Sequence, residues 1–211
     1  LVEPWNPVAG TNWVYDMMII RGTGQQAAIP DPFTGLYQSQ RVKKAEVTCI
    51  EGLPVTKTLD WVDLNFIDKI EVPGDAWIDW DAKAQRFISV SEAGKAGLTA
   101  KSKITVYYED NLFRDTKWHD GSPLSLADMV MKLVLAFDRA KPESKLFDAS
   151  AQVAFRSFQE TFRGIRIVNE DPLVIEYYTD QVYLDSEYLA GDAANIIWPF
   201  YSQGPGAWHV L

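Results

Sequence analysis

Residues 117–130 read KWHDGSPLSLADMV, a tight turn followed at once by a capped helix. Asp120 and Gly121 favour the turn, because glycine takes a positive φ without steric cost and aspartate is common in turns. Ser125 is a good N-cap residue, and the Asp128 carboxylate three positions later can accept a hydrogen bond from the backbone N–H of that cap. The stretch therefore predicts a helix that begins near residue 126.

The residues that follow this cap repeat with the period of an α-helix. Apolar side chains recur at i, i+3, i+4, i+7, i+8 and i+11, and they are Leu126, Met129, Val130, Leu133, Val134 and Phe137. This spacing places them on one face of the helix. We therefore expect that face to pack against the core of the domain.

Short runs rich in β-branched and aromatic residues precede the turn, and they predict a sheet. The predicted strands cover residues 45–50, 61–70, 76–80, 86–90 and 103–108. After the capped helix we predict a helix at 149–162, a β-hairpin at 165–178 and a helix at 186–198. The apolar positions of the first of these helices are Val153, Phe155, Phe158 and Phe162. Because strands and helices do not alternate regularly, the pattern favours an α+β fold in which a mixed or antiparallel sheet carries flanking helices.

Length and charge narrow the classes of function. With 211 residues, 47% of them hydrophobic, the chain can bury a substantial core. Its net charge of −9 argues against nucleic acid, since such binding needs cationic side chains that neutralise phosphates. No apolar run approaches the roughly 18 residues of a membrane-spanning helix. The N-terminus lacks a basic-then-apolar signal pattern, so we expect any signal peptide or lipid anchor to have been removed.

At residues 117–130 the chain resembles the family 5 extracytoplasmic solute-binding proteins of ABC importers. The hallmark of that family reads roughly K-W-x-D-G-x-P-(L/V)-T-A-x-D-V-V, and the differences here are Ser125 in place of Thr and Leu126 in place of Ala. Residues 162–176, FRGIRIVNEDPLVIE, are similar to the next segment of the family, a strand, a turn containing Asp and a second strand. The two motifs occur in the order that the family has them.

The resemblance implies a domain organisation. It implies part of a two-lobed periplasmic-binding-protein type II fold, in which residues 1–40 and 181–211 belong to the first ligand-binding lobe. Residues 41–180 would form an accessory α+β domain that carries the motif. Members of the family are several hundred residues long, so we expect this chain to be an N-terminal fragment without the second large lobe, and to bind ligand weakly or not at all.

The resemblance also implies a function without catalysis or a cofactor. We expect a monomer outside the cytoplasm, periplasmic or anchored at the cell surface, that captures a peptide, an oligosaccharide, a metal chelate or another small solute. The transmembrane permease subunits of an ABC importer would receive the solute. The implied ligand contacts are Gly10, Thr11, Asn12 and Trp13, in the loop before the first helix, and Met131, which stands where peptide-binding relatives often carry an aromatic residue.

A carbohydrate-binding module or a glycosidase fragment is the alternative. Asp79 and Asp81 lie on one face of a predicted strand, about 6.5 Å apart, a spacing that suits an inverting carboxylate pair. We favour structural roles, in which Asp81 begins a turn and Asp79 faces water. The 8 Trp and 9 Tyr could form stacking platforms for sugars, but we expect most of them, Trp118 included, to be structural.

The two histidines do not suggest a metal site. His119 and His209 are the only ones and lie far apart in the sequence. Metal sites usually combine several ligands at close spacing. We interpret His119 as a turn residue and predict no metal.

Overall fold

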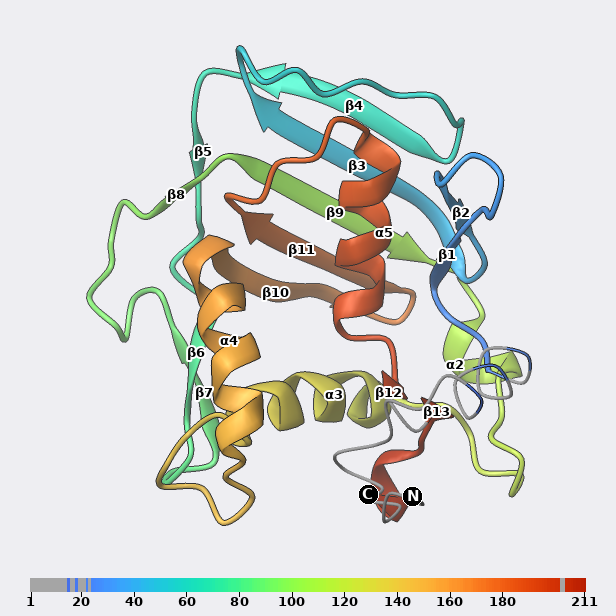
Figure 1. Cartoon of the computed structure of the whole chain (residues 1–211), viewed down its shortest axis with the longest axis vertical. Coiled ribbons are helices and arrows are strands. Elements are labelled where there is room, and N and C mark those ends of the chain that lie inside the picture. The colour runs from blue at the N-terminus through green and yellow to red at the C-terminus, as the bar shows by residue number, and fades with distance from the viewer. Residues whose placement is uncertain (1–14, 16–17, 19–21, 23, 202–203) are drawn as a thin grey trace.

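A computed structural model of the chain describes residues 15, 18, 22, 24–201 and 204–211, and it is built around one mixed β-sheet of seven strands (Figure 1). The strand order is β4-β3-β9-β11-β10-β6-β7. Their bounds are β3 Val42–Ile50, β4 Val62–Ile67, β6 Trp77–Asp81, β7 Arg86–Ser89, β9 Ser102–Tyr108, β10 Phe162–Glu170 and β11 Leu173–Thr179. Strands β3 and β4 are parallel and the other neighbours are antiparallel. The predicted α+β class with a mixed sheet is confirmed.

Helices and short two-stranded ribbons complete the fold. The helices are α2 Leu112–Asp115, α3 Leu126–Asp138, α4 Ala149–Thr161, α5 Ser186–Ile196 and the 3₁₀ helix η1 Trp208–Val210. The ribbons pair β1 Ala28–Pro30 with β2 Tyr37–Ser39, β5 Ile70–Glu71 with β8 Thr99–Ala100, and β12 Phe200–Tyr201 with β13 Gly204–Pro205. No helix among the described residues is long and apolar enough to span a membrane.

The core lies between the sheet and the helices α3, α4 and α5, which cover one face of the sheet (Figure 1). Strand β9 illustrates how the sequence builds this core. Ile104, Val106 and Tyr108 alternate along the strand and are buried on the helical side, where the Tyr108 hydroxyl donates to the carbonyl of Ala194 in α5 at 2.7 Å. A smaller cluster around Ile70 and Tyr178 forms a second core.

The capped helix forms as predicted. Helix α3 begins at Leu126, and the Asp128 carboxylate accepts from the backbone N and the hydroxyl of Ser125 at 2.7 and 2.9 Å. Its apolar face packs inward through Met129 and Leu133, both at most 1% exposed. The period-3.6 pattern is confirmed, because five of the six residues that repeat in sequence, all except Val130, belong to the core cluster or pack against it.

Two expectations about the other elements were wrong in detail. The predicted strand at 61–70 is two strands, β4 and β5, because Asp68 and Lys69 separate them. In α4, Val153 was expected on the apolar face but is 69% exposed. The helix faces the core through Phe155 and Phe158, which contact the Phe137 ring, and position 153 lies about 200° around the helix from 155.

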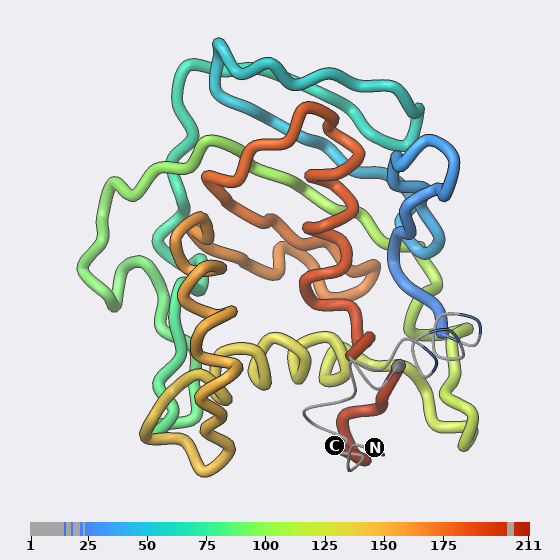
Figure 2. Tube along the Cα trace, in the orientation of Figure 1, coloured from blue at the N-terminus to red at the C-terminus, as the bar shows by residue number. Residues whose placement is uncertain are grey.

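Segments far apart in sequence meet beside α5, where β1 and β2 run alongside it (Figure 2). The Asn195 side chain accepts from the backbone N of Ala27 at 3.1 Å and donates to the carbonyl of Ala28 at 2.8 Å. The Tyr37 ring lies directly against Gly191, so that a Cβ there would overlap it. Gly191 is required for this close approach.

We predict that Gly191→Ala destabilises the domain by about 1–3 kcal/mol, because the added methyl overlaps the Tyr37 ring and outweighs the gain in helix propensity. Urea unfolding followed by circular dichroism measures this. Gly206→Ala is the control, since a Cβ there meets its nearest atoms at an ordinary 3.5 Å. Equal stability of Gly191→Ala and the unaltered chain would contradict the packing described for α5.

Candidate functional site

A cavity of about 700 Å³ opens beside the turn of the 117–130 motif. It is enclosed by that turn, by the end of α2, by Arg41 ahead of β3, and by the segment that follows α5. The lining residues are Gln25, Arg41, Asp115, Thr116, Lys117, Trp118, His119, Leu124, Trp198, Pro199 and Pro205. This volume lies within the range of about 300–1,000 Å³ that small-molecule sites occupy.

The turn fixes the backbone of Trp118. Its N–H donates to the carbonyl of Ser122 at 2.8 Å, and its carbonyl accepts from Gly121 N at 2.9 Å. Gly121 has a φ of 87°, as the sequence predicts for glycine in this turn. The Asp120 carboxylate accepts from the Ser122 hydroxyl and backbone N, and these hydrogen bonds hold the pKa of Asp120 down to about 2. The turn is thus rigid around the tryptophan.

Two buried donors at this cavity have no hydrogen-bond partner among the described residues. They are Nε1 of Trp118 and Nε of Arg41. A buried donor without an acceptor costs about 1–3 kcal/mol. Both side chains line the cavity, so a ligand with acceptor oxygens could satisfy both at once.

Trp118 packs as expected of a structural residue, and it has a second feature that the sequence did not indicate. Its ring packs partly against the core, but it also lines the cavity with an unused indole N–H. His119 lies exposed in the turn, as predicted, and lines the same cavity. The motif therefore both builds the turn and lines the cavity.

Charge at the cavity is positive on balance. The Arg41 guanidinium is held by Glu109, with Nη1 3.0 Å from the carboxylate oxygen. Lys117 contributes a second cation, whereas Asp115 is paired with Arg114 at 2.8 Å. The cavity thus favours ligands that bring carbonyl or carboxylate oxygens.

Trp198 forms an apolar wall of the cavity. The residue is 5% exposed, its ring stacks on Tyr108 with an interplanar angle of 14°, and its indole N–H donates to the carbonyl of Gln25 at 2.7 Å. Because that donor is already satisfied, Trp198 offers only apolar surface to a ligand. Nothing in the local sequence marks Trp198 or Arg41 as site residues, because only the tertiary fold brings them to the motif.

The segment after α5 is tied back to the motif. The backbone N of Trp208 donates to the Asp128 carboxylate at 2.8 Å, and His209 Nε2 lies 3.2 Å from the carboxylate of Asp120. These contacts bring Pro205 to the cavity rim. Residues separated by about 80 positions therefore share one site.

The carboxylates of the glycosidase alternative are engaged elsewhere. Asp79 was expected to face water, but it forms a partly buried ion pair with Lys141 at 2.6 Å, because α3 ends against β6. Asp81 begins the turn as predicted and accepts from the backbone N of Lys83 and of Ala84, each at 2.9 Å. Among the described residues no group of three His, Cys, Asp or Glu side chains could hold a metal ion.

The structure does not test most of the ligand contacts that the resemblance implies. Gly10, Thr11, Asn12 and Trp13 lie outside the described residues. Met131 is half-buried on α3 and does not line the cavity. Its role in ligand binding stays a prediction.

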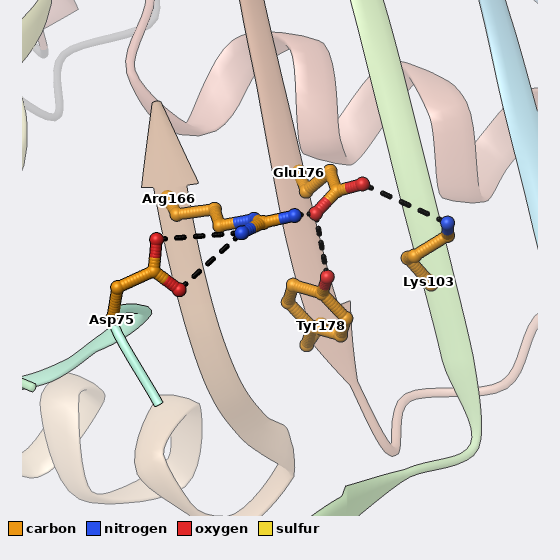
Figure 3. A network of polar contacts seen from close by, with 5 residues as sticks. All are labelled: Asp75, Lys103, Arg166, Glu176 and Tyr178. Carbon is orange, nitrogen blue, oxygen red and sulfur yellow. Dashed lines mark hydrogen bonds and ion pairs between the residues drawn. The ribbon is translucent and has the colours of Figure 1, made fainter. Parts of the chain in front are cut away.

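A second polar cluster, on the sheet face away from α3, α4 and α5, contrasts with the cavity (Figure 3). The Glu176 carboxylate accepts from Arg166 and from the Tyr178 hydroxyl, each at 2.6 Å, and Lys103 lies 3.6 Å away. Arg166 also reaches Asp75 at 3.3 Å. Every side chain of this network has a partner, so we assign it a structural role.

The network makes stability depend on pH. Burial alone would raise the pKa of Glu176, but the Tyr178 hydroxyl and the Arg166 guanidinium outweigh burial and hold the pKa below its ordinary value. The unfolded carboxyl titrates at about 4.3. The stabilisation is therefore fully present above that pH and is lost as the pH falls through the lower folded pKa.

We predict that Glu176→Gln lowers the free energy of unfolding by about 1–3 kcal/mol at neutral pH, since Arg166 loses a buried charge partner. Urea unfolding of both proteins between neutral pH and about pH 3 should show the difference shrinking as the pH falls. Glu170→Gln, on the exposed end of β10, is the control. A difference that stays constant with pH would refute the ionic role of Glu176.

Comparison with known proteins adds no assignment: no protein-family model matches the chain, and no curated protein matches it.

Proposed function

We propose that this chain is part of an extracytoplasmic receptor that binds a small solute, foremost a peptide, and delivers it to the permease subunits of an ABC importer. The observation that carries the proposal is the cavity beside the 117–130 motif, with its two unpartnered buried donors and its apolar wall. The resemblance of the motif to family 5 solute-binding proteins supports the same function. No cofactor and no bond-breaking step enter the proposal.

A peptide offers the hydrogen-bond acceptors that the two unpartnered donors of this cavity lack. A main-chain carbonyl oxygen can accept from Trp118 Nε1, and a terminal carboxylate can accept from Arg41 Nε. Charge-assisted hydrogen bonds of this kind are about twice as strong as neutral ones. The face of Trp198 provides apolar contact for a side chain or the peptide plane. Peptide binding would thus remove the cost of both unsatisfied donors.

In this proposal a second lobe closes over the cavity. Closure works by a hinge motion, and a ligand buried between the two lobes favours the closed state by its differential affinity. The two-lobed type II architecture, the monomeric state and the extracytoplasmic location belong to the proposal. We expect the cavity beside the motif, without such a lobe over it, to bind peptides in the millimolar range.

The test is a titration followed through the indole N–H signals of the ¹⁵N-labelled chain. Eight tryptophans give eight signals, and Trp118→Phe identifies that of Trp118. We predict that di- and tripeptides move the Trp118 signal downfield, because its N–H gains an acceptor. Trp118→Phe should weaken peptide affinity about tenfold, which corresponds to the loss of one hydrogen bond.

Trp77→Phe is the matched control, because Trp77 is half-buried against Phe87 and does not line the cavity. It should leave peptide affinity unchanged. A Trp118 signal that no peptide, oligosaccharide or nickel chelate moves at about 10 mM would exclude the proposed site. A shift produced by oligosaccharides alone favours the carbohydrate-binding alternative, which the pair of tryptophans in one cavity also suits.

A further inference from the structure

A second cavity, of about 420 Å³, lies on the helical face of the sheet between α3, α4, α5 and β11. Figure 1 shows these three helices arranged around this part of the sheet. The cavity shares no lining residue with the one beside the motif. It therefore calls for a separate explanation.

The cavity contains a cation without an anionic partner. Lys132 of α3 donates from Nζ to the carbonyl of Asn195, in the last turn of α5, at 2.8 Å. An ammonium group has three donors, so this contact leaves two of them unused. No carboxylate among the described residues forms an ion pair with Lys132. Burial lowers the pKa of Lys132 to about 8, which still leaves the amine mainly protonated at neutral pH.

The same cavity contains an anion without a cationic partner. Asp192 of α5 accepts from the Tyr183 hydroxyl at 2.8 Å, and burial raises the pKa of its carboxyl group. Within the described part of the chain, no lysine, arginine or histidine forms an ion pair with this carboxylate. Asp192 and Lys132 also do not pair with each other, although both line the cavity.

Lys132 and Asp192 carry opposite charges and line the same cavity, but they do not contact each other. Such a cavity is complementary to a zwitterion, a ligand that carries one positive and one negative group. A simple carboxylate would pair with Lys132 but place a like charge near Asp192. A simple amine would leave Lys132 uncompensated. Since buried charges are costly unless they are paired, a ligand that carries both charges fits best.

We propose that this cavity binds a free α-amino acid with an apolar side chain. The ligand carboxylate accepts from Lys132, and the ligand ammonium donates to Asp192. The side chain packs against Phe158, Leu189 and Ile196, which supply the apolar part of the lining. The proposal does not depend on the peptide site beside the motif.

The first test uses ligand analogues on the unaltered chain, so that folding of a variant plays no part. Calorimetric titration compares L-phenylalanine with 3-phenylpropanoate, which lacks the ammonium, and with phenethylamine, which lacks the carboxylate. We expect each analogue to bind at least tenfold more weakly than the amino acid. Equal affinity of the three compounds, or no binding of L-phenylalanine or L-leucine at about 10 mM, would overturn the proposal.

Variants then assign the two charges. Lys132→Met should weaken L-phenylalanine at least tenfold and make phenethylamine the better ligand, whereas Asp192→Asn should favour 3-phenylpropanoate. Lys43→Met, at an exposed lysine paired with Asp110, is the control and should bind as the unaltered chain does. Trp118→Phe should also leave amino-acid binding intact. Loss of amino-acid binding in Trp118→Phe would instead place the amino acid in the motif cavity and overturn this inference.

Discussion

The cavity beside Trp118 depends on the hydrogen bonds that the Asp128 carboxylate accepts. Asp128 is 1% exposed, and its carboxylate accepts three hydrogen bonds, from the backbone N and hydroxyl of Ser125 and from the backbone N of Trp208. Through these contacts one buried charge fixes the start of α3, the end of the motif turn and the C-terminal segment. Because hydrogen bonds to a charged group are the strong ones, the three segments are held in one arrangement, and that arrangement forms the cavity beside Trp118.

Local sequence patterns correctly predicted the elements that are held by contacts between residues close in sequence. The cap at Ser125 and the helical spacing from Leu126 predicted α3, and Asp81 was correctly predicted to begin the turn between β6 and β7. Sequence patterns failed where contacts between distant segments decide which face of an element is buried or which residues line a cavity. Val153 fits a helical apolar face in sequence but points away from the phenylalanine cluster. Arg41 and Trp198 carry no local signal, since only the tertiary fold brings them to the cavity beside the motif.

The Glu176 network and the two cavities differ in how far their polar groups are satisfied. In the Glu176 network every charge has a partner, and the network joins β9, β10 and β11 (Figure 3). At the two cavities the polar groups are incompletely satisfied: two donors without acceptors at one, and two unpaired charges at the other. Since native proteins satisfy most buried polar groups internally, these exceptions are the observations on which the two binding proposals rest.

The strand order has a consequence for how the chain acquires its structure. The interior strand β9, residues 102–108, pairs on one side with β3 from residues 42–50 and on the other with β11 from residues 173–179. During synthesis, the backbone N–H and C=O groups on one edge of β9 therefore stay unpaired until some 70 further residues have left the ribosome. Non-local pairing of this kind slows folding, so the middle of this sheet is exposed to mispairing for longer than its hairpins are.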